Sequence, residues 1–302
     1  MSVAPGAGPR TAPIALSILP DPPAPPAPMG LIAGAGRLPI LVAEGMRKLG
    51  HPVLAVGLSG QYDAALPGMC DRFVEAGVLR PASWGRALRK MGARHAVMVG
   101  RVDKARMLYS WSLILRNMPD LRAWRMYFQL RRDRRSHVIL LSLAEGLAKD
   151  GVELIDSTAH IPDHLAHAGV MTDRQPSAVQ RASIEHGWEI LLEMLRLDIG
   201  QAISVRDRDV IAVEAVEGTD RMIARSGELC RNGGWCLLKA ARAGHDRRSD
   251  VPTVGPDTIR NMHAAKGSVL ALAAGDVIIV DKQETLALAD RLGIAVVGVP
   301  AV

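Results

Sequence analysis

Acidic side chains gather at the end of one apolar, strand-like run of the chain. Residues 210–220 read Val-Ile-Ala-Val-Glu-Ala-Val-Glu-Gly-Thr-Asp. Alternation along a strand at 210–216 places Glu217 on one face and Glu214 on the other, and Gly218 then ends the run. Because open α/β sheets bind their ligands at the carboxyl ends of strands, this spacing indicates a binding site.

Thr219 and Asp220 come next, at the start of an expected helix. Asp220 has two interpretations. It is a ligand of a bound cation, or it only caps the helix, as aspartate often does.

A second polar segment lies at 245–256 and reads His-Asp-Arg-Arg-Ser-Asp-Val-Pro-Thr-Val-Gly-Pro. It follows Lys239, which ends another apolar run. Pro252 and Gly255-Pro256 restrict its backbone. We expect so polar and rigid a loop to position a ligand; the alternative is a solvated loop held by its own ion pairs.

These residue types suit the hydrolysis of a pyrophosphate. The reaction needs carboxylates that hold a divalent cation, cationic side chains that neutralise the phosphates, and a positioned water. Magnesium prefers one or two carboxylates together with substrate oxygens. Asp220 and Asp250 are the predicted Mg2+ ligands, with Glu217 or Asp246 nearby in sequence. The predicted cationic groups are Lys239, Arg247 and Arg248.

A glycine loop, Gly34-Ala35-Gly36-Arg37-Leu38-Pro39, follows an apolar strand and opens a helix, where backbone N–H groups can hold an anion. Pro39 stands where a dinucleotide fingerprint has its third glycine. The second strand ends at Leu58-Ser59-Gly60-Gln61, with no acidic residue for a ribose diol. An NAD-type cofactor is therefore disfavoured, while a nucleotide site and a plain turn both stay open.

Strands and helices alternate around these residues. In the first half, strands are expected at 29–33, 53–58 and 96–100, and helices at 38–49, 84–91 and 136–149. In the second half, a helix is expected at 177–196 and strands at 202–205, 210–216, 235–239, 269–273, 277–280 and 295–299. This order predicts a Rossmann-like nucleotide-binding domain at 29–155 and a second α/β domain, the catalytic one, at 177–302.

Periodicity is lost between the two predicted domains, at 156–176, which we interpret as a linker. It holds His160, His164 and His167, whose spacing suits zinc ligands on a helix. Pro162 interrupts that helix, so we interpret the three histidines as linker residues.

Composition bounds the class of protein. A chain of 302 residues that is 48% hydrophobic can form two domains, and its net charge of +6 suggests an anionic partner. The three cysteines form no Cys-x-x-Cys pair, so we expect a reducing cytoplasm. No apolar run reaches the roughly 18–20 residues that span a bilayer. The proline-rich residues 1–28 lack a signal-peptide pattern and are interpreted as a flexible extension.

Arginine and aromatic residues are mixed within 108–135. The aromatics are Tyr109, Trp111, Trp124, Tyr127 and Phe128. Such a mixture suits a lipid headgroup interface, although stacking on single-stranded nucleic acid uses the same residue types. An amphipathic surface with core-facing aromatics is the third interpretation.

The motifs taken together resemble one enzyme family. They are Gly-Leu-Ile-Ala-Gly-x-Gly-x-Leu-Pro at 30–39, Leu-Asp-Ile-Gly-Gln at 197–201, Val-Glu-Ala-x-Glu-Gly-Thr-Asp at 213–220, Lys239, and Arg-x-Asp-x-Pro-Thr-Val-Gly at 248–255. From about residue 30 to 300 the chain resembles the UDP-2,3-diacylglucosamine pyrophosphatases of lipid A biosynthesis, the LpxI family.

The resemblance implies an Mg2+-dependent hydrolase that holds its substrate between two domains. It would release UMP and 2,3-diacylglucosamine 1-phosphate, directing water at the β-phosphate. Asp220 and Asp250 are expected to hold the metal, and Lys239 and Arg248 to counter the phosphate charge. The expected substrate-binding residues are Gly34, Gly36, Arg37, Leu38, Gly100, Gln201, Glu217, Gly218, Thr219, His245, Asp246, Pro252 and Thr253.

The expected partners are the lipid-linked sugar nucleotide and the cytoplasmic surface of the inner membrane, touched peripherally; a homodimer is left open. A non-catalytic sugar-nucleotide or lipid-binding protein is the alternative, because residues 108–137 look diverged from the family. A nucleic-acid-binding protein is the third hypothesis, motivated by the basic charge, and we do not favour it.

Overall fold

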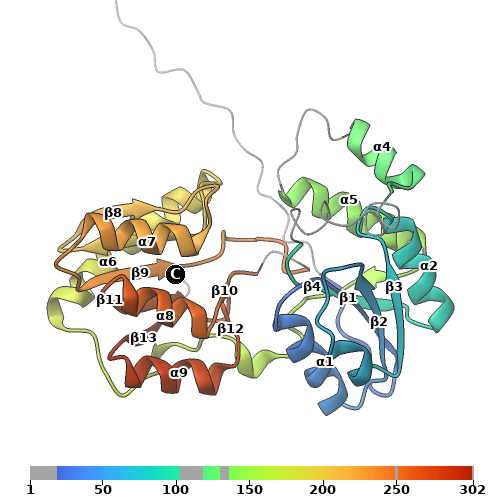
Figure 1. Ribbon diagram of the computed structural model, residues 1–302, viewed down its shortest axis with the longest axis horizontal. Helices are drawn as coiled ribbons and strands as arrows, with labels where there is room; N and C mark the ends of the chain where they lie inside the picture. The colour runs from blue at the N-terminus through green and yellow to red at the C-terminus, as the bar shows by residue number, and fades with distance from the viewer. Residues whose placement is uncertain (1–18, 103–117, 130–135, 249–250, 301–302) are drawn as a thin grey trace, which may run out of the picture.

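The computed structural model describes residues 19–102, 118–129, 136–248 and 251–300. These residues form two α/β domains, one at each end of an elongated molecule (Figure 1). The predicted fold class is therefore confirmed. In the described residues, no helix is long and apolar enough to cross a membrane.

The N-terminal domain contains a parallel sheet with strand order β3-β2-β1-β4-β5. Its strands are β1 (Met29–Ala33), β2 (Val53–Leu58), β3 (Arg72–Ala76), β4 (His95–Val99) and β5 (Glu153–Leu154). Its helices are α1 (Leu38–Lys48), α2 (Pro81–Met91), α4 (Leu121–Gln129) and α5 (Ser136–Lys149), with the 3-10 helix η1 (Leu66–Met69). Leu31 packs in a cluster with Val42 of α1, and its neighbour Ile32 packs in another with Leu88 of α2. The sheet is thus covered on both faces, as the near-continuous apolar strands require.

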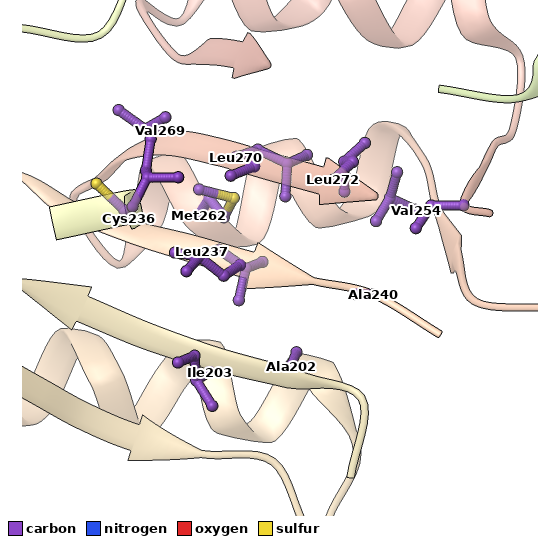
Figure 2. Packing of buried hydrophobic residues seen from close by; sticks show 14 of the residues in the cluster. Ala202, Ile203, Cys236, Leu237, Ala240, Val254, Met262, Val269, Leu270 and Leu272 are labelled. Carbon is purple, nitrogen blue, oxygen red and sulfur yellow. The ribbon is translucent and has the colours of Figure 1, made fainter. Parts of the chain in front are cut away.

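The C-terminal domain contains a larger mixed sheet with strand order β6-β13-β11-β9-β7-β8. Its strands are β6 (Gly169–Val170), β7 (Ala202–Arg206), β8 (Asp209–Val213), β9 (Trp235–Lys239), β11 (Gly267–Ala273) and β13 (Ala295–Val299). Its helices are α6 (Ala178–Arg196), α7 (Thr219–Leu229), α8 (Pro256–Ala264) and α9 (Lys282–Arg291). Ile203, Leu237 and Leu270 come from neighbouring strands and lie side by side in the core (Figure 2).

A small parallel pair, β10 (Thr253–Val254) and β12 (Ile278–Ile279), lies between the two large sheets (Figure 1). Ile278 is fully buried in the same apolar cluster as Leu31 of the N-terminal sheet, whereas Val254 packs into the C-terminal core. The pair therefore joins the two cores.

The predicted linker at 156–176 contains the 3-10 helix η3 (Pro162–His164) and strand β6. Strand β6 pairs antiparallel with β13 of the C-terminal sheet. Within the described part of the predicted extension, the Ala27 carbonyl lies 2.9 Å from His51 Nδ1.

The predicted strand at 210–216 was wrong at its end. Strand β8 stops at Val213 rather than at Val216, whose side chain is fully exposed. The Glu217 carboxylate accepts the Ala215 N–H at 3.1 Å, and this local bond replaces the strand ladder. Glu217 therefore lies in a turn, not on a strand face.

His160 is buried, and neither of its ring nitrogens has a hydrogen-bond partner. Its ring meets that of His51 edge-on, with centroids 5.3 Å apart. Burial, together with the His51 charge, lowers the pKa of His160 from 6.5 to about 4. His160 is therefore a neutral core side chain in the folded protein at neutral pH.

We expect acid to destabilise the protein through this histidine. Between pH 6.5 and about 4 the unfolded chain binds a proton that folded His160 does not, so stability falls as the pH falls through that window. The loss is up to about 3 kcal/mol. Urea unfolding across this range should show a flatter pH dependence for His160→Gln than for the wild type. The same flattening in His263→Gln, which removes an exposed histidine, would contradict the assignment.

Candidate functional site

A cavity of about 800 Å3 lies between the two domains. Its walls come from the loop after β1, the end of β4, the turn before α7, the segment from β10 into α8, and the turn from β12 into α9. Most of these segments follow the carboxyl end of a strand, which is where open α/β sheets place ligands. The domain arrangement thus creates a site that neither domain holds alone.

Helix N-termini converge on this cavity. Leu38 of α1, Thr219 of α7, Pro256 of α8 and Glu284 of α9 all line it, and each lies in the first turn of its helix. Unpaired backbone N–H groups and the helix dipole make such ends attractive to anions. Arginine side chains add to this field, and those in the lining are Arg37, Arg101 and Arg260.

About half of the predicted site residues line the cavity. They are Gly36, Arg37, Leu38, Gly100, Glu217, Gly218, Thr219, Asp220 and Thr253. Those that do not line it are Gly34, Gln201, Lys239, His245, Asp246, Arg248 and Pro252. Asp250 lies outside the described residues, although its neighbour Val251 lines the cavity.

Gly34 packs against Gly100, which lines the cavity. A Cβ on Gly34 would lie 2.6 Å from the Arg101 carbonyl oxygen, and Gly100 has a φ of +101°. The loops that carry them are joined by hydrogen bonds between Ala35 and Arg101, at 2.7 and 2.9 Å. Both glycines therefore let two loops meet closely, and Gly34 shapes the site without lining it.

Arg37, in the cavity lining, forms an ion pair that links the N-terminal domain to the C-terminal domain. Its Nε lies 3.1 Å from Asp281 Oδ1, and its Nη2 lies 3.3 Å from Glu44 Oε1. Asp281, with a φ of 44°, precedes helix α9. An anionic ligand that takes the guanidinium must compete with these carboxylates.

Lys239 is buried behind the cavity at the end of β9, with 4% of its surface exposed. Its Nζ donates to Thr219 Oγ1 at 2.7 Å, and that hydroxyl donates to Glu214 Oε1 at 2.8 Å. Glu214 Oε2 lies 3.7 Å from Nζ. Burial lowers the pKa of Lys239, while the carboxylates of Glu214 and Asp220 act in the opposite direction. Lys239 thus reaches the cavity only through Thr219.

Glu214 is a residue that our sequence analysis did not assign to the site. A strand that ran on to Val216 would place Glu214 on the face opposite Glu217, but β8 ends at Val213. Glu214 is instead buried, and its backbone N–H donates to Ala202 in the neighbouring strand. The sequence feature that could have assigned Glu214 to the site is its position at a strand end, in the run Glu-Ala-Val-Glu-Gly-Thr-Asp.

Asp220 is not a helix cap. The residue before α7 is Gly218, with a φ of 83°, and Asp220 is the second residue of the helix. Its Oδ1 accepts from Asn261 Nδ2 of α8 at 3.0 Å. The capping interpretation is therefore wrong, and this carboxylate lies in the cavity wall.

Glu217 is held by its own turn. Its carboxylate accepts the Ala215 N–H and forms an ion pair with Arg225 at 2.5 Å. Backbone hydrogen bonds and Arg225 hold the pKa of Glu217 below its ordinary value.

Arg248 and Asp246 neutralise each other. Arg248 Nε lies 2.8 and 3.0 Å from the two Asp246 carboxylate oxygens, and Nη2 lies 2.6 Å from one of them. The ion pair with Arg248 outweighs burial and lowers the pKa of Asp246. His245 Nδ1 lies 3.0 Å from the Arg242 carbonyl oxygen. Arg248 was expected to contact the phosphate, but it does not line the cavity.

Arg247 joins the domains. Its guanidinium donates to Asp156 and Thr158 on one side, at 2.7 and 2.8 Å, and to Asp276 and the Gly275 carbonyl on the other, at 2.6 and 3.1 Å. The predicted role in neutralising phosphate is therefore replaced by a structural one.

Removing the Arg247 guanidinium should loosen the domain interface. We expect Arg247→Gln to lower the free energy of unfolding by about 2 kcal/mol, because partly buried carboxylates lose their partner. Urea unfolding measures this loss. Arg196→Gln removes an exposed pair with Glu193 and should cost less than about 0.5 kcal/mol. Equal losses in the two variants would refute the interface role.

Arg101 and Arg260 are lining residues that the sequence analysis missed. Arg101 directly follows Gly100 at the end of β4, so the strand-end rule could have found it. Arg260 lies on α8, one turn after the helix start, and pairs with Asp257 at 2.7 Å. Nothing in its own spacing points to the cavity.

Carboxylates in the lining could hold a divalent cation. They are Glu217, Asp220, Asp257, Asp281 and Glu284. Within residues 19–102, 118–129, 136–248 and 251–300, no three His, Cys, Asp or Glu side chains are grouped closely enough to hold a metal ion by themselves. Asp220 fits a magnesium site that takes one or two protein carboxylates and completes its shell with substrate oxygens and water.

The fold and the cavity define a class: two α/β domains with a cavity between them, lined by segments that follow the carboxyl ends of their strands. Residues 28–164 match the model of the LpxI N-terminal domain, and residues 167–297 match that of the LpxI C-terminal domain. The chain belongs to the LpxI family.

A curated relative extends the comparison. The chain is 28% identical over 282 residues to the UDP-2,3-diacylglucosamine pyrophosphatase LpxI of Caulobacter vibrioides, covering 90% of this chain and 97% of that protein. Among solved structures, the biotin carboxylase domain of a single-chain bacterial carboxylase overlaps with a TM-score of 0.22 and 14% identity, over 70% of this chain and 56% of that one. That overlap is too low to indicate a shared fold.

Proposed function

We propose that this protein is an Mg2+-dependent hydrolase that cleaves the pyrophosphate of UDP-2,3-diacylglucosamine during lipid A biosynthesis. The products are UMP and 2,3-diacylglucosamine 1-phosphate. Membership in the LpxI family supports the substrate, since the Caulobacter relative is named for it.

The observation that carries the proposal is the convergence of helix N-termini and arginines on one interdomain cavity. A nucleoside diphosphate sugar brings two adjacent negative phosphates, and helix N-termini are suited to such a group. At about 800 Å3, the cavity has room for the polar part of this substrate.

Each described residue has a role that follows from its position. Arg37, Arg101 and Arg260 are the arginines of the lining and would contact the diphosphate. Thr219 is fixed by Lys239 and Glu214 and presents a positioned hydroxyl at the wall. A bound Mg2+ would draw charge from the phosphoryl oxygens.

The metal would be held by Asp220 together with Asp250, and this assignment stays a prediction. In the reaction, water attacks the β-phosphorus, and the bond from that phosphorus to the bridging oxygen breaks. UMP leaves with the bridging oxygen, and the water proton goes to solvent.

Hydrolysis in heavy-oxygen water tests the proposal. With Mg2+ present we expect UMP release, and we expect the heavy oxygen in the sugar phosphate. Heavy oxygen in UMP instead would overturn the point of attack. Tight substrate binding with no product would establish the alternative, a non-catalytic sugar-nucleotide or lipid-binding protein.

The acyl chains of this substrate keep it in a membrane, so we propose that the protein works peripherally at the cytoplasmic surface of the inner membrane. A homodimer stays a prediction.

A further inference from the structure

Asp281 stands at the start of helix α9 without capping it. The residue has a φ of 44° and a ψ of 55°, in the left-handed region. An aspartate before a helix usually accepts hydrogen bonds from the first backbone N–H groups. Within the described chain, the Asp281 side chain makes no such bond to α9, and it meets Arg37 Nε at 3.1 Å instead. The stability of α9 therefore does not explain where this carboxylate points.

The turn that carries Asp281 is held by other groups. The Thr285 N–H donates to the Asp281 carbonyl at 2.9 Å. Lys282 Nζ donates to the carbonyls of Asp163 and Leu165 at 3.0 and 2.7 Å, which ties the turn to the segment between the domains. Residues other than glycine adopt the left-handed conformation where their surroundings fix it, often at functional sites. The turn thus holds Asp281 in the cavity lining.

Arg37 has the corresponding position in the N-terminal domain. It precedes helix α1, and its side chain makes no capping bond to that described helix. Arg37 and Asp281 both line the cavity, and their side chains are 45% and 25% exposed. An ion pair this accessible to water is weak, because solvation compensates for its loss. A phosphate offers the guanidinium a planar, charge-assisted contact of greater strength, so a ligand in the cavity can displace Asp281.

We propose that Asp281 sets the affinity of the site by competing with the diphosphate of the ligand for Arg37. The inference rests on the proposed function, which places a diphosphate in this cavity. Without ligand, Asp281 occupies the guanidinium; when the diphosphate binds, Arg37 exchanges the carboxylate for a phosphate. Glu44 contacts Arg37 Nη2 at 3.3 Å but does not line the cavity, so Asp281 is the carboxylate that a bound ligand meets.

Titration calorimetry of the full chain with UDP, at fixed salt and without Mg2+, tests this inference. Asp281→Asn removes the charge and keeps the turn, because asparagine tolerates the left-handed conformation. We expect this variant to bind UDP about threefold to tenfold more tightly than the wild type, since the phosphates no longer displace a carboxylate. Unchanged or weaker binding of UDP overturns the proposal.

A double-mutant cycle tests whether the gain passes through Arg37. Arg37→Gln should weaken UDP binding by about tenfold. On that background, Asp281→Asn should change the affinity by less than about twofold, because the group for which it competes is gone. A gain of full size in the double variant would exclude competition for Arg37.

The matched control is Glu284→Gln. Glu284 lies in the first turn of the same helix and lines the same cavity. Among the described residues, the ion pairs of Arg37 are those with Glu44 and Asp281. Removing the Glu284 charge should therefore tighten UDP binding by less than about twofold. Equal gains in Glu284→Gln and Asp281→Asn would assign the effect to the overall charge of the cavity and refute the competition.

UDP binding and UMP release together separate this inference from the proposed function. If Asp281→Asn gains affinity through Arg37 but the wild type hydrolyses no lipid-linked sugar nucleotide, only the proposed hydrolysis is wrong. If the wild type releases UMP and Asp281→Asn gains no affinity for UDP, only the role of Asp281 is wrong.

Discussion

We expect Lys239→Met to lower the free energy of unfolding by about 3–5 kcal/mol and to abolish turnover. The ammonium is buried with Glu214 and donates to Thr219 at 2.7 Å, so its removal leaves a buried carboxylate without its counter-charge. It also removes one of the two hydrogen bonds that hold the Thr219 hydroxyl, and Thr219 lines the cavity. Chemical denaturation measures the first effect and UMP release the second.

A double variant separates the two effects. Lys239→Met with Glu214→Gln removes both charges, so most of the lost stability should return while activity stays absent. If the free energy of unfolding of Lys239→Met lay within about 1 kcal/mol of the wild-type value, the buried ion pair would not have the proposed role in stability. Recovery of activity in the double variant would also exclude Lys239 as the residue that positions Thr219.

Asp220→Asn should reduce the rate of hydrolysis by about a thousandfold, which corresponds to about 4 kcal/mol of transition-state stabilisation. The amide oxygen can still accept from Asn261, so we expect the fold to persist. The rate should depend more steeply on the Mg2+ concentration than in the wild type, because a weaker ligand set needs more metal. Asp250→Ala should lose activity to a similar degree.

The matched control lies on the same helix. Glu228 is exposed in the last turn of α7, far from the cavity lining, and Glu228→Gln should keep the wild-type rate and Mg2+ dependence. If Asp220→Asn remained within about tenfold of the wild type, the proposed metal ligand would be wrong.

Much of the fold could be predicted because its signals are local. The strands at 29–33, 53–58, 235–239 and 295–299 were predicted with the boundaries that the structure has. Each is an apolar run long enough for a buried strand and bounded by polar or turn residues. The prediction for β8 was too long because Val216 continues the apolar pattern. The hydrogen bond from the Ala215 N–H to Glu217, which ends the strand, leaves no mark on that pattern.

The site was harder to predict than the fold. The strand-end rule led to Glu217 and Asp220, and the glycine loop before a helix led to Gly36; all three line the cavity. The need for positive charge beside a phosphate led to Arg247 and Arg248, and neither of them lines the cavity. In the structure Arg247 donates to Asp156 and Thr158, and Arg248 pairs with Asp246.

The sequence by itself determined the order of strands and helices, the two-domain α/β class and the family, since all of these depend on residues that are near one another in the chain. Only the tertiary structure decided which charges face the cavity and which neutralise each other. Arg37 meets Asp281 across 244 residues, and Arg247 meets Asp156 across 91. Such pairs form only when packing of the two cores brings distant loops together, and Coulomb attraction between side chains falls with a distance that the sequence does not contain.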